Sequence, residues 1–311
     1  MNKVMISPKN YHGWDGYCLS NGEIEIGVTP NIGGRIISLR YREEELLYVD
    51  QNRLGEIFEW GKIEDLSTFK KAFGFRLWGG DKTWVAPEQN WIVGIPPLHL
   101  DAGQYAACVD GQSITMTSPV DQETGLQMIR KIALQSNGEI TLTQQFTNQS
   151  HKTISCGIWD VTQLLRPFRI YFPARGDQVK PDTRFAASLE NQHELLNSVM
   201  ENWVEIRCET PLQFKYSCDI TQGVVVALKE QVDHLIAMVR YFDISPEKKY
   251  PQGGMVEVYN SGDYPYLELE VLSPLADLNE HDQIAHQQTW LLKHFPKTMT
   301  INEILSSVVK P

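Results

Sequence analysis

With 311 residues the chain is long enough to bury a large core, and its formal net charge is −11 at pH 7. This acidic excess opposes binding to nucleic-acid phosphates and anionic lipid surfaces, so we expect neither nucleic acid nor a membrane as a partner. The N-terminal residues lack the apolar run of a signal peptide and no later stretch is long enough for a membrane span, which predicts a cytoplasmic protein.

Short runs of alternating or β-branched residues recur along the whole chain and are separated by turn signals. Asn-Gly and Asp-Gly turns join antiparallel neighbours, so the pattern predicts an all-β, antiparallel fold. Ile140 and Leu142 alternate with threonines, which predicts that one face of their sheet is wet. The predicted strands, in chain order, are 23–28, 35–41, 113–117, 126–134, 139–147, 153–159, 224–229, 235–241, 255–259, 266–272 and 283–292.

Helix signals are few and predict short additions to the sheets. The sequence shows no alternation of strands with helices, no internal repeat and no Pro/Ser-rich linker. We therefore predict a single domain over residues 1–311. The alternative is two sandwiches that meet near residues 173–181. The predicted helices are 66–73 after an Asp65 cap, 189–200, and a C-terminal helix to Val309 opened by the capping box of Thr300 and Glu303.

The segment 77–91 combines three tryptophans, two adjacent glycines, acids and a lysine, and it fits no simple strand or helix pattern. Glycines admit a ligand close to the backbone, rings stack on sugar C–H faces, and carboxylates accept bonds from hydroxyls, so the segment favours carbohydrate recognition. A structural loop pinned by its tryptophans is the alternative, and Asp81 with Lys82 could be a surface ion pair. The candidate residues are Trp78, Asp81, Lys82, Trp84 and Glu88, with Trp84 and Glu88 favoured.

Further candidates lie near the two ends of the chain. Arg35 follows a double glycine at the start of a predicted strand, where it could point into a cleft or form a salt bridge. Glu268 and Glu270 share one strand face, and if that face lines a cleft the neighbouring acids raise each other's pKa. For Glu268 a solvated outer face is an equal alternative. Glu257 lies in an otherwise apolar and aromatic strand, which suggests a carboxylate held in a pocket.

Signals for cofactors and metals are missing. The 5 cysteines are widely spread without a Cys-x-x-Cys pair, so we expect reduced thiols, and His281 and His286 are spaced for neither a helix nor a strand face. The sequence has no dinucleotide fingerprint, no phosphate-binding loop and no Gly-x-Ser-x-Gly elbow. We therefore expect no cofactor and no catalytic metal.

Several pieces occur together in a familiar order over residues 14–292. The sequence of these pieces resembles the galactose-mutarotase-like (aldose 1-epimerase) superfamily, and within it a bacterial branch. The pieces are Leu-Ser-Asn-Gly-Glu-Ile-Glu-Ile from residue 19, Gly-Gly-Arg-Ile-Ile-Ser-Leu from 33, Phe-Thr-Asn-Gln-Ser from 146, Leu-Glu-Leu-Glu-Val-Leu-Ser-Pro-Leu-Ala-Asp-Leu from 267 and Gln-Thr-Trp-Leu from 288.

The resemblance implies a supersandwich of two large antiparallel sheets with a sugar cleft on a concave face. In mutarotases a glutamate takes the anomeric hydroxyl proton and a histidine protonates the ring oxygen, and the late Leu-Glu motif implies Glu270 as that base. Where the family has its histidine, this sequence has Trp159 and Asp160. Trp159 would be a stacking platform, and Asp160 an alternative acid if burial raised its pKa.

Two functions remain open at this stage. The first is a carbohydrate-binding protein that also acts as a sugar mutarotase or epimerase through carboxylate acid-base catalysis. The second is a non-catalytic sugar sensor or scaffold that has lost the proton-transfer pair. Either would take a small or oligomeric carbohydrate as partner, and homo-oligomerisation is left open.

Overall fold

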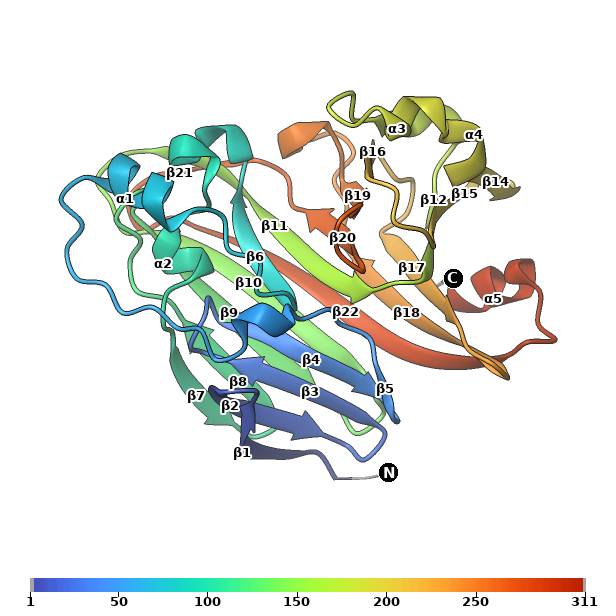
Figure 1. Cartoon of the computed structure of the whole chain (residues 1–311), viewed down its shortest axis with the longest axis horizontal. Helices are drawn as coiled ribbons and strands as arrows, with labels where there is room; N and C mark the ends of the chain where they lie inside the picture. Colours follow the sequence, from blue (N-terminus) through green and yellow to red (C-terminus); the bar gives the residue numbers. More distant parts are fainter. Residues whose placement is uncertain (1–2, 310–311) are drawn as a thin grey trace.

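The computed structural model describes residues 3–309 and consists of two large antiparallel β-sheets (Figure 1), which confirms the predicted fold class. Within these residues the first sheet has 12 strands. In spatial order they are β1 (Met5–Tyr11), β2 (Trp14–Ser20), β3 (Ile24–Thr29), β4 (Arg35–Tyr41), β6 (Asp81–Ala86), β11 (Ile154–Leu165), β20 (Tyr266–Leu272), β19 (Val256–Asn260), β16 (Phe214–Cys218) and β13 (Val179–Pro181), with β5 (Glu44–Glu45) beside β4 and β21 (Ala276–Leu278) beside β11.

The second sheet has 10 strands in the described part of the chain. Its order is β14 (Leu196–Met200), β15 (Trp203–Cys208), β12 (Phe168–Pro173), β17 (Val224–Glu230), β18 (His234–Phe242), β22 (Gln283–Pro296), β10 (Ile140–Asn148), β9 (Leu126–Leu134), β8 (Ser113–Thr117) and β7 (Ala106–Asp110). Each strand pairs antiparallel with its neighbours.

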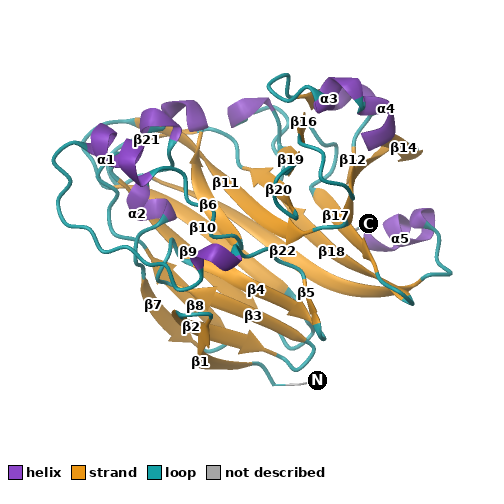
Figure 2. Cartoon of the chain, in the orientation of Figure 1, coloured by secondary structure: helices purple, strands orange, loops and turns teal. Residues whose placement is uncertain are grey.

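Helices lie at the periphery of the sheets (Figure 2). The α-helices are α1 (Leu66–Phe73), α2 (Leu98–Asp101), α3 (Ala187–Glu190), α4 (Gln192–Leu195) and α5 (Ile301–Val308), and the 3-10 turns are η1 (Gln51–Arg53), η2 (Glu88–Asn90), η3 (Ile92–Gly94), η4 (Gly176–Gln178) and η5 (Pro251–Gly253). Asp65 caps α1 and Thr300 with Glu303 forms the capping box of α5, as their sequences predict.

The main hydrophobic core lies between the two sheets. Ile26 and Leu39 of the first sheet and Leu142 and Phe146 of the second belong to one cluster and are completely buried. Each such side chain contributes about 1.5–3 kcal/mol by leaving water. A smaller cluster joins the outer side of the second sheet to α5 through Ile304 and other apolar residues.

Two local predictions are wrong. Residues 189–200 do not form one helix: α4 ends at Leu195, and the next five residues form the edge strand β14 against β15. The segment 77–91 is not irregular throughout, because it contains β6, a central strand of the first sheet. All six residues of β6 are buried, so the alternation that marks a half-exposed strand is missing from its sequence.

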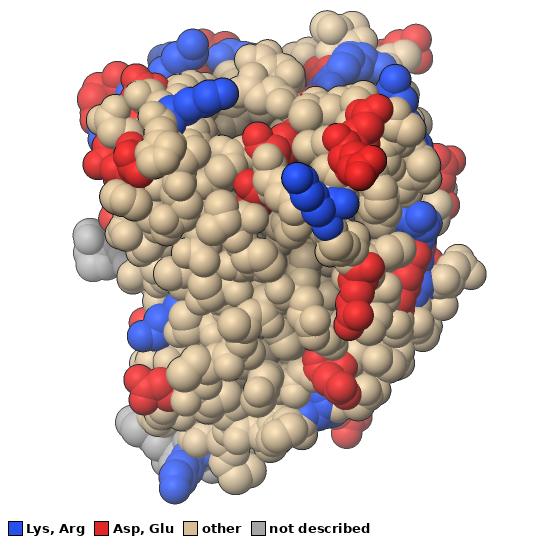
Figure 3. Space-filling view, turned by 90° about the vertical axis from the view of Figure 1, so that its left-hand side faces the viewer, with Lys and Arg blue, Asp and Glu red and all other residues tan. Residues whose placement is uncertain are grey.

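Charge is unevenly spread over the end of the molecule that Figure 3 shows. Acidic and basic side chains are densest along the upper and right-hand margins, with a few more at the left and lower margins, and a broad area in the centre of the view has none. Within residues 3–309, no helix combines the length and the apolar character needed to cross a bilayer.

Candidate functional site

The register of five neighbouring strands places polar side chains in a row on one face of the first sheet. Lys82 of β6 lies opposite Val161 of β11, which lies opposite Glu270 of β20. Glu270 lies opposite Glu257 of β19, and Glu257 lies opposite Ser217 of β16. Residues directly opposite each other share a face. We call the set Lys82, Lys215, Glu257, Glu268 and Glu270 the polar face.

Lys215 joins two carboxylates of the polar face. Its Nζ lies 2.7 Å from Glu257 Oε2 and 3.0 Å from Glu270 Oε2. The indole Nε1 of Trp159 donates a second hydrogen bond, of 2.7 Å, to Glu270 Oε2. Glu270 is 0% exposed, and its other oxygen, Oε1, has no hydrogen-bond partner among the described residues. One buried carboxylate oxygen is therefore left without the partner that such a group normally has.

Burial and charge set the protonation of this group of residues. Burial raises the pKa of Glu270 well above its usual range, Lys215 opposes this, and the neighbouring Glu257 and Glu268 add to it. For Lys215, burial alone lowers the pKa, but Glu270 and Glu257 outweigh burial and the pKa is raised. Lys215 thus remains an ammonium group, and Glu270 takes up a proton at a higher pH than an exposed glutamate.

A second ion pair lies beside the first. Lys82 Nζ lies 3.2 Å from Glu268 Oε1, and Gln163 Nε2 donates a 2.8 Å hydrogen bond to the same oxygen. Burial lowers the pKa of Lys82, and Glu268 opposes this shift. The ammonium group of Lys82 also lies 4.4 Å from the ring centre of Trp84. The alternative of a surface ion pair between Asp81 and Lys82 is wrong, because Lys82 pairs with Glu268 and Asp81 with Arg130.

Three tryptophans pack against one another beside the polar residues, with Trp84 and Trp159 on the same face of the sheet. The ring centroid of Trp84 lies 5.2 Å from that of Trp91 and 5.1 Å from that of Trp159, and the centroids of Trp91 and Trp159 are 5.7 Å apart. All three residues are at least 91% buried. Their rings contact each other and Lys82 or Lys215, so Trp84 and Trp159 do not present the free ring face that sugar stacking needs.

A pocket of about 500 Å³, which we call the first pocket, opens next to Lys215 and Glu257. Its remaining lining is mostly polar and includes Glu88, whose Oε1 lies 2.8 Å from Arg184 Nη1. Of the residues predicted from sequence, Glu88 and Glu257 line this pocket. The full lining is Pro87, Glu88, Gln89, Pro181, Asp182, Thr183, Arg184, Lys215, Ser217, Gln252 and Glu257.

Other predicted residues lie away from this pocket. Arg35 is 1% exposed and forms a 2.6 Å ion pair with Asp101, whose Oδ1 also accepts a hydrogen bond from Trp84. A Cβ at Gly79, just before β6, would lie 2.3 Å from Tyr48 O, so the double glycine allows close packing of two backbones. Trp78 is fully buried in a separate apolar cluster.

Asp81 and Asp160 face the interior between the two sheets. Both are 0% exposed; Asp81 is paired with Arg130 and Asp160 with Arg240. This corrects the expectation that either carboxylate reaches the cleft, since strand alternation points their side chains to the face opposite Glu270. Burial raises the pKa of Asp81 to about 6, but the side chain is fully buried and does not line the first pocket.

Sequence reasoning missed Lys215, the cation at the centre of the site. The signal was available, because Phe214, Tyr216 and Cys218 alternate with Lys215 and Ser217 and predict a half-exposed strand. Arg184, Gln89 and Gln252 lie on turns whose spatial meeting no local pattern indicates. Within the described part of the chain, no three His, Cys, Asp or Glu side chains are grouped as metal ligands.

Comparison with solved structures shows which fold this is. The match to the Slr1438 protein of Synechocystis covers 94% of this chain and 99% of that chain, with a TM-score of 0.60 at 10% sequence identity. The match to a galactose mutarotase-like protein from Lactobacillus casei covers 89% of this chain and 99% of that chain, with a TM-score of 0.57 at 10% identity. The match to another such protein, from Clostridium acetobutylicum, covers 94% of this chain and 99% of that chain, with a TM-score of 0.57 at 12% identity. These likenesses confirm the galactose-mutarotase-like fold that the sequence motifs suggest.

Comparison of sequences gives one family and no curated relative. Residues 16–293 match the family described as "Domain of unknown function (DUF4380)". A search of the curated proteins finds no match.

Proposed function

Since this chain belongs to the DUF4380 family and has a galactose-mutarotase-like fold, we propose that it binds a carbohydrate in the first pocket, in contact with Lys215 and Glu257. The supporting observation is the lining of that pocket, where an ammonium group and a carboxylate lie 2.7 Å apart on adjacent strands. Sugar hydroxyls both donate and accept hydrogen bonds, so a vicinal diol can accept from Lys215 while it donates to Glu257.

Rigid placement of these groups supports binding. Lys215 and Glu257 lie on neighbouring strands of a large sheet, and the Lys215 ammonium group also contacts Glu270 and the ring of Trp159. Little side-chain freedom is then lost when a ligand binds, and charge-assisted hydrogen bonds are stronger than neutral ones. The pocket volume of about 500 Å³ falls in the range of small-molecule sites.

Glu257→Gln tests this proposal by isothermal titration with a panel of aldoses and their disaccharides. The amide keeps the shape of the side chain but removes the negative charge that accepts hydroxyl protons, so we expect affinity to fall at least 10-fold, about 1.4 kcal/mol. Glu205→Gln is a matched control, because Glu205, like Glu257, is buried and paired with a cation, here Arg207, but lies on the second sheet. Absence of heat with every sugar, from a correctly folded wild type, would refute the proposal.

A mutarotase is the second candidate, and the raised pKa of Glu270 favours it. When it is ionised, a glutamate with a raised pKa is a stronger base than an exposed one, and it can take the proton of an anomeric hydroxyl. Complete burial of Glu270 under Trp159 and Lys215 argues for binding alone. The two candidates separate by NMR of freshly dissolved α-anomers: a rate of anomer exchange equal to that without protein excludes the mutarotase and leaves the binding proposal intact.

A further inference from the structure

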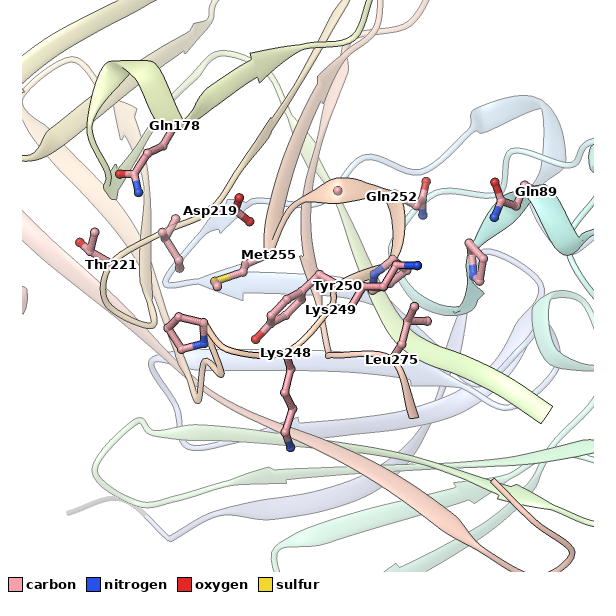
Figure 4. A pocket seen from close by; sticks show the side chains of 15 residues that line it. Gln89, Gln178, Asp219, Thr221, Lys248, Lys249, Tyr250, Gln252, Met255 and Leu275 are labelled. Atoms are coloured by element: carbon pink, nitrogen blue, oxygen red, sulfur yellow. The ribbon is translucent and has the colours of Figure 1, made fainter. Parts of the chain in front are cut away.

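A second and larger pocket adjoins the first. Its volume is about 770 Å³, and it shares Pro87, Gln89 and Gln252 with the first pocket. Figure 4 shows Gln89 and Gln252 at one end of this second pocket and Gln178, Asp219 and Thr221 at the other. The two pockets meet at these shared residues, and we call the pair the groove, which extends from Lys215 past Gln252 to Asp219.

The far end of the groove also carries hydrogen-bonding groups. Asp219 supplies a carboxylate, and its Oδ2 lies 3.3 Å from Lys180 Nζ in an ion pair at the surface. Thr221 and Gln178 supply a hydroxyl and an amide. Tyr250 contributes a ring to the wall, and its hydroxyl accepts a 2.9 Å hydrogen bond from Ser245 N, which fixes the ring in place. This end of the second pocket combines a flat ring with hydrogen-bond donors and acceptors, which are the groups that bind a sugar unit.

Gln252, where the two pockets meet, has two unusual features. Its φ is +59°, in the left-handed region that residues other than glycine rarely adopt. Its Nε2 is buried and has no hydrogen-bond partner in the part of the chain that the structure describes. Backbone strain and an unpaired buried donor each cost free energy, and such costs concentrate at ligand-binding positions. A ligand oxygen that lies across the boundary would satisfy this donor.

We propose that the ligand is an oligosaccharide of at least two sugar units, with one unit in each pocket and the linkage between them next to Gln252. This inference rests on the proposed carbohydrate binding in the first pocket and specifies the class of ligand. A monosaccharide fills one pocket and leaves the other hydrated, whereas a longer chain gains contacts with Asp219 and Thr221 without paying again for the loss of translational freedom.

Chain length is the first variable of the test. Isothermal titration compares galactose, glucose and xylose with their β-1,4-linked di- and trisaccharides on the full chain. We expect at least one series in which affinity rises 10-fold or more from one sugar unit to two or three.

The second variable is a pair of matched variants. Asp219→Ala removes a carboxylate of the second pocket whose ion pair is exposed, so folding is little affected. We expect Asp219→Ala to abolish the rise in affinity from one sugar unit to two or three, and to leave the affinity for monosaccharides unchanged. Asp177→Ala, in another exposed ion pair outside both pockets, should change neither. Thermal unfolding of each variant verifies the fold.

The outcomes separate the two proposals. Equal affinity for one, two and three units overturns the oligosaccharide inference and leaves carbohydrate binding standing. A chain-length gain that survives Asp219→Ala overturns the placement of the second unit. If no saccharide of any length binds, both proposals are wrong.

Discussion

His286 is a titratable side chain that the structure keeps neutral. It lies on β22, is 7% exposed, and its Nε2 has no hydrogen-bond partner among residues 3–309. Burial lowers its pKa to about 4, although Asp160 opposes the shift. The unfolded chain therefore binds more protons than the folded chain between pH 4 and 6.5, so this histidine costs stability as the pH falls through that window.

We expect His286→Leu to reduce the acid sensitivity of the protein. Leucine has no proton to gain, and the unpaired Nε2 means that the replacement leaves no broken hydrogen bond. Urea unfolding at pH 7 and pH 5 should show that wild type loses about 2 kcal/mol more than the variant. Equal losses for the two proteins would show that His286 is not protonated on unfolding.

Individual residues of the site could be predicted where their chemistry conflicts with their surroundings. Glu257 and Glu270 are carboxylates within apolar strands, and such residues need a specific partner. The partner itself, Lys215, comes from a strand that sequence reasoning passed over. Lys215 lies 55 residues before Glu270, and no local pattern links positions so far apart.

At the scale of single elements, β11 shows why Asp160 was assigned to the cleft. Trp159 and Val161 point to one face of the sheet and Asp160 and Thr162 to the other, as strand alternation requires. The sequence predicts this alternation, but both faces of the strand are buried. Which face lines the cleft and which faces the second sheet depends on the packing of the sheets, so burial alone could not distinguish them.

Helix α5 was predicted correctly because its signals are local. Thr300 Oγ1 accepts a hydrogen bond from Glu303 N, and Glu303 Oε2 accepts one of 2.7 Å from Thr300 N. These bonds depend only on residues three apart. The prediction of one helix over 189–200 was wrong because a non-local contact decides this segment. The apolar residues there have helical spacing, but the pairing of β14 with β15 outweighs this local preference.

We expect Thr300→Ala to destabilise the protein by about 1 kcal/mol, because it leaves the first backbone N–H groups of α5 without an acceptor. The apolar residues of α5 pack on the second sheet, so fraying of this helix should also expose Tyr171 and its neighbours. Urea unfolding measures the loss. Thr300→Ser, which keeps the hydroxyl acceptor, is the matched control and should unfold at nearly the wild-type urea concentration.

At the scale of the whole molecule, buried ion pairs connect the two sheets. Arg240 of β18 reaches across the interior to Asp160 of β11, to Thr162 Oγ1 at 2.8 Å and to Leu269 O at 3.2 Å. Arg130 of β9 similarly contacts Asp81 of β6. Both arginines are fully buried. The sheets thus pack through a polar layer as well as through the apolar core.

Removing one partner of such an ion pair should lower the free energy of unfolding more than removing both partners. We expect Arg240→Met to cost about 3–5 kcal/mol, because Asp160 is then a buried charge without a counter-ion, and Arg240→Met with Asp160→Leu to recover much of that loss. Tryptophan fluorescence during urea unfolding reports both values. A double variant as unstable as the single one would mean that the bonds of Arg240 to Thr162 and Leu269, not the ion pair, dominate.

The composition of the polar face has a consequence for the ligand that it can select. Its two lysines and three glutamates sum to one negative charge when all are ionised, so the opposite charges nearly cancel. Such a nearly balanced array exerts little attraction beyond contact distance, even in a chain with a net charge of −11. Selection at this face therefore depends on the directions of hydrogen bonds, and the affinity for an uncharged sugar should be nearly independent of ionic strength.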